Sequence, residues 1–243
     1  MYFYAVFAWY FAVIGIVVLF YPDFHMATVY ISYLGAPEHS PAYLVYNINV
    51  LIIGACIFPV YIFVSRALRK GLENPSQNGN ESKSQSNVII QMTHGSNALF
   101  VFLGFIGCLG FSLLGIYYQG IAETSLIGAE HGHRIATWMA FGGFGFSAFF
   151  LLVSFIFRLL LDPKRAFPTL KNFLAPFLVA LLFALVPLTI EMWPVPELYK
   201  SDHFDEWFFM FTVVALLVIT PLLVPSNYGR THMQEQETPN KEN

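Results

Sequence analysis

Charged side chains are scarce in this chain: only 11% of its 243 residues are Asp, Glu, Lys or Arg, whereas 56% are hydrophobic. A soluble domain carries roughly 25% charged residues, so this chain has too few to cover a water-facing surface. Cysteine is also rare, and both residues lie inside apolar runs, which excludes a disulfide framework. The net charge of −3 lacks the basic excess that nucleic-acid binding requires. The composition therefore predicts a protein that presents most of its surface to lipid.

Six apolar stretches are long enough to cross a hydrocarbon core of about 30 Å. They are Tyr2–Phe20, Tyr43–Ser65, Ser96–Tyr118, Ile135–Phe157, Phe173–Ile190 and Trp207–Val224. No basic segment precedes the first stretch and no small-residue cleavage site follows it, so we expect a retained span and not a signal peptide. The sequence thus predicts an all-α polytopic membrane protein, with a six-transmembrane-helix bundle over residues 1–225 and a disordered cytosolic tail over residues 226–243.

Basic residues predict the orientation of the bundle. All but Arg134 and Lys200 lie in the loops after the second and fourth stretches or in the tail. The positive-inside rule therefore places both termini and these two loops in the cytosol. The segment Glu73–Asn87 is polar and nearly free of apolar residues, so we expect a disordered connector there.

Small residues recur at helical spacing in two of the stretches, a pattern that lets helix backbones approach closely in lipid. They are Gly104, Cys108, Ser112 and Gly115 in the third stretch, and Ala136, Ala140, Gly143 and Ser147 in the fourth. The pattern favours packing of the third span against the fourth over a groove for a substrate.

Acids and histidines gather in the loops on the predicted non-cytosolic side, most densely in Glu130-His131-Gly132-His133-Arg134. In an extended segment, His131 and His133 would point the same way and would be able to chelate a metal. In a helix they would diverge by about 200°, and the segment would be a charged helix start. No strict ligand spacing such as HExxH is present, so a metal site is disfavoured. Glu206-Trp207 opens the sixth stretch, where a carboxylate suits the helix dipole and Trp suits the interface.

The order of several motifs resembles the FRAG/DRAM/SFK family of six-span membrane proteins, which includes the damage-regulated autophagy modulators. The resemblance covers roughly residues 3 to 225. It rests on Ile31-Ser32-x-x-Gly35-x-Pro37, Asn47, Gly115-Ile116-Tyr117-Tyr118-Gln119, a histidine at 131 or 133, and Glu206-Trp207. The chain departs from the family pattern at Tyr33, where members often carry Asp. The resemblance implies a lysosomal, other endomembrane or plasma-membrane protein linked to autophagy or membrane-lipid organisation, and it implies no catalytic residues.

We therefore expect a non-enzymatic membrane modulator that uses no metal or cofactor and binds membrane lipids or other membrane proteins, not nucleic acid. Its site is predicted at the non-cytosolic rim, either as a lipid-binding site or as a polar latch between helix ends. The predicted site residues are Ser32, Gly35, Asn47, Gln119, His131, His133 and Glu206. The alternative is a membrane-embedded lipid-remodelling enzyme or hydrolase that pairs His131 or His133 with Glu38, Glu130 or Glu206. A transporter is disfavoured because no span has a charge at its centre.

The predicted orientation is testable at Asn80-Glu81-Ser82, the one glycosylation sequon in the chain. Because the loop that contains it is predicted to be cytosolic, Asn80 will carry no glycan when the protein is produced in a eukaryotic host. Glycosidase treatment followed by gel mobility and mass spectrometry checks this. A glycan on Asn80 would reverse the orientation of the whole bundle.

Overall fold

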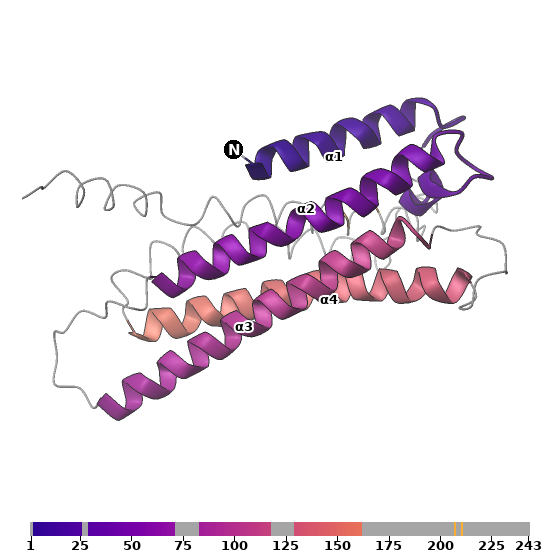
Figure 1. The fold of residues 1–243 in the computed structure, drawn as a ribbon. Coiled ribbons are helices and arrows are strands. Elements are labelled where there is room, and N and C mark those ends of the chain that lie inside the picture. The colour runs from indigo at the N-terminus through magenta and orange to yellow at the C-terminus, as the bar shows by residue number, and fades with distance from the viewer. Residues whose placement is uncertain are drawn as a thin grey trace, which may run out of the picture.

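The computed structural model describes residues 2–25, 29–70, 83–117 and 129–161, together with Trp207 and Met210. Within these residues the secondary structure is helical and contains no strand. Four α-helices follow in chain order: α1 (Tyr2–Leu19), α2 (Tyr43–Lys70), α3 (Lys83–Leu114) and α4 (Ala129–Leu161). A short 3-10 helix, η1 (Ile31–Gly35), lies between α1 and α2 (Figure 1).

Three of these helices are long and apolar enough to cross a membrane, through Tyr43–Arg66 in α2, Asn87–Leu114 in α3 and His131–Leu161 in α4. At 1.5 Å per residue each exceeds the hydrocarbon thickness of about 30 Å. The apolar part of α1, Tyr4–Leu19, is shorter. The prediction of a helical membrane protein is confirmed to this extent, whereas the count of six spans and the cytosolic termini stay predictions. The fifth predicted span, most of the sixth, Asn80 and the tail lie outside the described residues.

The long helices extend beyond the apolar stretches that predicted them. α3 begins at Lys83, well before Ser96, so the predicted connector Glu73–Asn87 is wrong over its last five residues, 83–87. α4 likewise begins at Ala129 and not at Ile135. A span that is already helical adds one hydrogen bond for each further residue, so polar flanks propagate the helix at little cost. Hydropathy identifies only the apolar part of a helix, so it does not predict these polar turns at the helix ends.

The end of the bundle formed by η1, the start of α2 and the start of α4 is called the outer end below (Figure 1). The opposite end, which carries Arg66, Arg69 and Arg158, is called the basic end. Arg158 of α4 donates a hydrogen bond to the carbonyl oxygen of Leu68 in α2, so the basic termini of both helices lie together. The grouping of basic residues on one side is therefore visible in the fold, as the charge pattern predicts.

α3 lies between α2 and α4 and contacts both (Figure 1). The small residues of α4 pack on α3 as predicted, because a Cβ on Gly143 would overlap the backbone of Gly107. The predicted stripe of α3, however, faces α2: a Cβ on Gly104 would overlap the ring of Tyr61, and one on Gly115 would overlap the carbonyl oxygen of Asn47. That half of the packing prediction is wrong. The contact with α4 uses Gly107 and Gly110, one turn apart on a different face.

Polar side chains, most of them buried, join α3 to both neighbours. Towards α2, the Asn97 amide donates to Ser65 Oγ at 3.0 Å, and the Ser112 hydroxyl donates to the Leu51 carbonyl oxygen at 3.1 Å. Towards α4, the hydroxyls of Ser96 and Ser154 lie 2.8 Å apart, and the Ser147 hydroxyl donates to the Phe100 carbonyl oxygen at 3.0 Å. Polar groups inside a membrane bundle need such partners, since lipid offers none.

α1 contacts α2 and also reaches α3 through aromatic packing. Its buried residues recur every three or four positions and form one face: Phe7, Tyr10, Val13, Ile14 and Val17. The Tyr10 ring packs against Phe111 of α3 with centroids 6.0 Å apart, and its hydroxyl lies 2.8 Å from the Met210 sulfur. Met210 therefore contacts α1 inside the bundle.

The contact between Gly143 and Gly107 predicts a large difference between two glycines of α4. Gly143→Leu forces the helices apart and will cost ~2 kcal/mol, which lowers the Tm in detergent by roughly 4–8 °C. Gly145→Leu is the matched control, because a Cβ at Gly145 meets nothing within 4 Å. Phe150 is partly buried against the core, so it is unsuitable as a control. Equal Tm values for the two variants would contradict this interface.

Candidate functional site

The first loop folds back over the outer end of the bundle. In η1, Ile31 and Leu34 bury their side chains, and the Tyr33 amide donates to the Tyr30 carbonyl oxygen at 3.0 Å. The Asn47 amide of α2 donates to the Gly35 carbonyl oxygen at 2.9 Å. A Cβ on Gly35 would overlap Asn47 Oδ1 and approach the Tyr46 ring. The motif residues Gly35 and Asn47 therefore form one close contact that holds η1 on α2.

The histidine cluster lies in the first turns of α4, so its conformation is helical. His131 is exposed, whereas His133 is half-buried and its Nδ1 lies 2.8 Å from the Tyr117 carbonyl oxygen. The two rings diverge, as a separation of two residues in a helix requires. The chelating arrangement that an extended segment would give is thereby excluded. Gly132 allows the Tyr117 ring to pack on α4, since a Cβ there would overlap that ring.

Three of the predicted site residues line one small cavity at the outer end: Ser32, Asn47 and His133. Thr137, one turn after His133, adds a hydroxyl to the lining, and this hydroxyl donates to the His133 carbonyl oxygen at 2.9 Å. The remaining lining is apolar and comes from Ile31, Tyr46, Val50, Phe111, Leu114, Phe141 and Met210. The cavity has a volume of about 30 Å³, enough for a water molecule or a single polar group.

Several polar atoms at the outer end are buried and lack a hydrogen bond within the described part of the chain, and of these only Asn47 Oδ1 belongs to a residue that lines the cavity. They are Asn47 Oδ1, both side-chain polar atoms of Asn49, and Ser40 Oγ. Only 5% of Asn47 is exposed, and an orphaned acceptor at this depth costs roughly 1–3 kcal/mol. The Asn47 oxygen therefore needs a donor from a water molecule or a ligand that enters the cavity.

The other predicted residues are placed less fully. His131 is exposed and does not line the cavity, and Gly35 lies beside it through its bond with Asn47. Gln119 and Glu206 lie outside the described residues. Trp207, which follows Glu206, is buried and its Nε1 donates to the Val29 carbonyl oxygen at 2.7 Å. The start of the predicted sixth span thus contacts the first loop at the outer end.

Tyr46, Thr137, Trp207 and Met210 contribute to this region, and the sequence did not single them out as site residues. Thr137 lies four positions after His133, so helical spacing alone places both on one face. Met210 has no such signal, because an apolar residue inside an apolar stretch carries no mark of the cavity that it lines.

Within the described residues, no group of three metal-ligating side chains is present. Glu38 is exposed, and no described carboxylate makes a hydrogen bond with His133. As far as the structure describes the chain, the cavity offers an imidazole, an amide oxygen and hydroxyls. Such groups bind a polar ligand by hydrogen bonds.

Comparison with models of known protein families, with curated proteins and with solved structures finds no match to this chain.

The bond from Asn47 to Gly35 predicts how η1 responds to two nearby substitutions. Asn47→Leu removes the donor and will weaken the hold on η1 by ~1 kcal/mol, so backbone amides at residues 33–36 will exchange hydrogen several-fold faster. Asn49→Leu is the matched control, because Asn49 is as deeply buried but makes no hydrogen bond within the described residues. Hydrogen exchange with mass spectrometry on the purified protein measures both. Unchanged exchange in Asn47→Leu would show that the bond does not restrain η1.

Proposed function

We propose that the protein is a non-enzymatic multi-pass membrane modulator that binds the polar headgroup of a lipid at its outer end. The supporting observation is the convergence of Ser32, Asn47 and His133 from η1, α2 and α4 on one cavity. Asn47 Oδ1 is buried there with no donor in the described residues. A headgroup hydroxyl or ammonium group supplies the missing donor, and His133 and Ser32 supply further hydrogen bonds.

The size of the cavity sets how the ligand enters. A volume of about 30 Å³ holds one polar group of a headgroup and not the whole of it. Entry of a larger headgroup requires η1 to move away from α2, which breaks the bond from Asn47 to Gly35. Binding is therefore coupled to the first loop, and the same contacts that form a latch in the closed state form a site in the open one.

The enzyme alternative needs a carboxylate within hydrogen-bond reach of a histidine beside a substrate cavity. In the described residues His133 is held by the Tyr117 carbonyl oxygen, and Glu38 is exposed. A cavity of this size also admits no scissile bond of a lipid in the closed state. These features favour binding over hydrolysis. The enzyme alternative can be tested at Glu206, one of the acids that were predicted to pair with a histidine.

The resemblance to six-span autophagy modulators agrees with this proposal, since that family is linked to autophagy and membrane-lipid organisation. The proposal extends to the compartment, which is a lysosomal, other endomembrane or plasma membrane, with the cavity on the non-cytosolic side. Helix-end contacts sensitive to lipid would then change the shape of the outer end that partner membrane proteins meet.

The test compares two histidines of α4. His133→Gln will lower the retention of lipid by the purified protein several-fold, because the substitution removes a cavity-lining ring. His131→Gln will leave it unchanged, because His131 is exposed. Retention is measured by native mass spectrometry after incubation with vesicles of phosphatidylcholine, phosphatidylserine and phosphatidylinositol. Thermal unfolding confirms that both variants are folded.

Equal retention by the two histidine variants would reject the headgroup site and leave the latch. A variant Glu206→Gln separates binding from catalysis. It will retain lipid, and the wild type will release no fatty acid or headgroup from those vesicles. Hydrolysis by the wild type that is lost in Glu206→Gln would establish the enzyme instead.

A further inference from the structure

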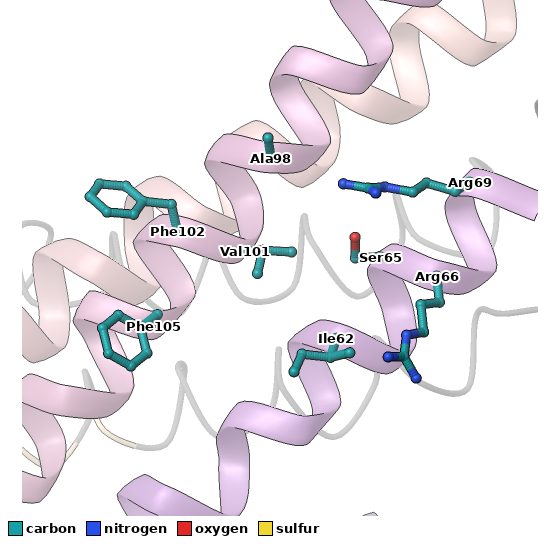
Figure 2. Close-up of a pocket in the computed structure, with 8 residues that line it drawn as sticks. All are labelled: Ile62, Ser65, Arg66, Arg69, Ala98, Val101, Phe102 and Phe105. Atoms are coloured by element: carbon teal, nitrogen blue, oxygen red, sulfur yellow. The ribbon is translucent and has the colours of Figure 1, made fainter.

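A second cavity lies at the basic end, between α2 and α3, and no predicted site residue belongs to it. It has a volume of about 480 Å³, within the range of cavities that hold small ligands. Its lining comes from the last turns of α2 and the middle of α3: Ile62, Ser65, Arg66, Arg69, Ala98, Val101, Phe102 and Phe105. Figure 2 shows these side chains on the two facing helices.

The lining changes character along the helix axis. Arg66 ends the apolar span of α2, and Arg69 lies one turn beyond it. Figure 2 shows the Arg69 side chain reaching across the gap towards Ala98 of α3, and Val101 and Ile62 lying deeper between the helices. From Ala98 to Phe105 the cavity extends for roughly 10 Å along α3, at 1.5 Å per residue. It is therefore cationic at the membrane edge and apolar further in.

Among the residues that the structure describes, the two guanidinium groups have no acidic counterpart at the basic end. Both arginines are exposed, and neither makes a salt bridge or hydrogen bond within the described residues. The sequences of α2 and α3 contain no Asp or Glu at all. Both arginines line the cavity, with the Arg66 side chain directed towards Ile62 and the Arg69 side chain towards Ala98 (Figure 2). Cations with no anion among the described residues attract one, and guanidinium matches the oxygens of a phosphate in charge and geometry.

A third donor lies between the arginines and the apolar part. Ser65 is 6% exposed and lines the cavity. The Asn97 amide donates to Ser65 Oγ at 3.0 Å, which occupies a lone pair and orients the hydroxyl. Figure 2 shows this oxygen directed into the gap beside Arg69. The Ser65 proton has no acceptor within the described residues, so it is available to a phosphate oxygen.

The apolar wall distinguishes a lipid from a free anion. Phe102 and Phe105 are 58% and 46% exposed, although they lie inside the apolar span of α3. Phe105 also packs edge-on against Phe58 of α2, with ring centroids 5.3 Å apart. A soluble anion gains nothing from these rings, whereas an acyl chain beneath a phosphate covers them.

We propose that this cavity binds one anionic glycerophospholipid, with its phosphate between Arg66, Arg69 and Ser65 and an acyl chain along the wall formed by Val101 and Phe105. The positive-inside rule predicts that the basic end is cytosolic, and anionic lipids are concentrated in the cytosolic leaflet. The site is separate from the outer-end cavity, so it goes beyond the function proposed above and does not depend on it.

The experiment uses full-length protein in mild detergent, titrated with dioleoyl phosphatidylserine or dioleoyl phosphatidylcholine and followed by native mass spectrometry. The wild type will bind phosphatidylserine about tenfold or more tightly than phosphatidylcholine. Arg66→Gln and Arg69→Gln will each weaken phosphatidylserine binding about fivefold, a typical contribution of one basic residue near anionic lipid. The double variant will lose the preference. All variants are compared by Tm, and both arginines are exposed, so the fold is retained.

Two further variants distinguish binding in this cavity from non-specific attraction between basic residues and anionic lipid. Arg134→Gln removes an exposed arginine at the outer end and will leave the preference unchanged. Ala98→Trp keeps both arginines but fills the cavity from α3, and it will weaken phosphatidylserine binding as strongly as the double variant. This variant also tests the site if the double variant fails to fold.

Inorganic phosphate distinguishes the two sources of a phosphate group. At 10 mM it will displace little bound phosphatidylserine, because it lacks an acyl chain. Equal affinity of the wild type for both lipids, or a preference that survives in the double variant, would overturn the proposal. An equal loss in Arg134→Gln, no effect of Ala98→Trp, or full displacement by inorganic phosphate would overturn it as well.

Discussion

The close approach of α3 to both α2 and α4 is the contact on which the rest of the described fold depends. Lipid provides no hydrophobic force between helices, so association in the membrane relies on backbone proximity and internal hydrogen bonds. α3 obtains both on two faces: Gly104 and Gly115 face α2, and Gly107 and Gly110 face α4. The bonds from Asn97 to Ser65 and from Ser96 to Ser154 fix the register at the basic end. The positions of both cavities follow from this arrangement, since the walls of each include residues of α3.

The sequence predicts which segments are helical in lipid and that small residues join them, because hydropathy and spacing report these properties directly. It cannot tell which of two small-residue faces meets which neighbour. Gly104 and Gly107 are three positions apart, and a composition pattern holds no information on the order of helices around α3. The same limit applies to the histidines. His131 and His133 are equally polar, so composition does not distinguish them. Because α4 already begins at Ala129, the two histidines lie on different faces of a helix, and His133 is the one that lines the cavity. Ser32, Gly35 and Asn47 were singled out because they belong to the motifs that carry the family resemblance, whereas Met210 belongs to no such motif.

The two ends of the bundle differ in how they present their polar and charged groups. At the outer end, polar groups are covered by η1 and enclose a space of about 30 Å³. At the basic end, arginines stay exposed above a cavity of about 480 Å³ whose far wall is apolar. A closed polar cavity discriminates by hydrogen-bond geometry, because an unsuitable ligand leaves a buried group unpaired. An open cationic one discriminates by charge and accepts varied acyl chains. The two proposed sites would therefore select their lipids by separate physical rules.

The two-sided packing of α3 also constrains how the chain is assembled during synthesis. α2 and α3 leave the ribosome before α4, so they can pair through Gly104, Gly115 and the amide of Asn97 as soon as both are in the membrane. Until α4 follows, the face with Gly107 and Gly110 remains bare, and it is the kind of surface through which transmembrane helices dimerise. A nascent chain arrested before residue 129 thus exposes a self-associating surface, which the arrival of α4 covers. The length of time for which that face stays bare is set by translation of the loop between α3 and α4, and this links the rate of elongation to the yield of monomeric protein.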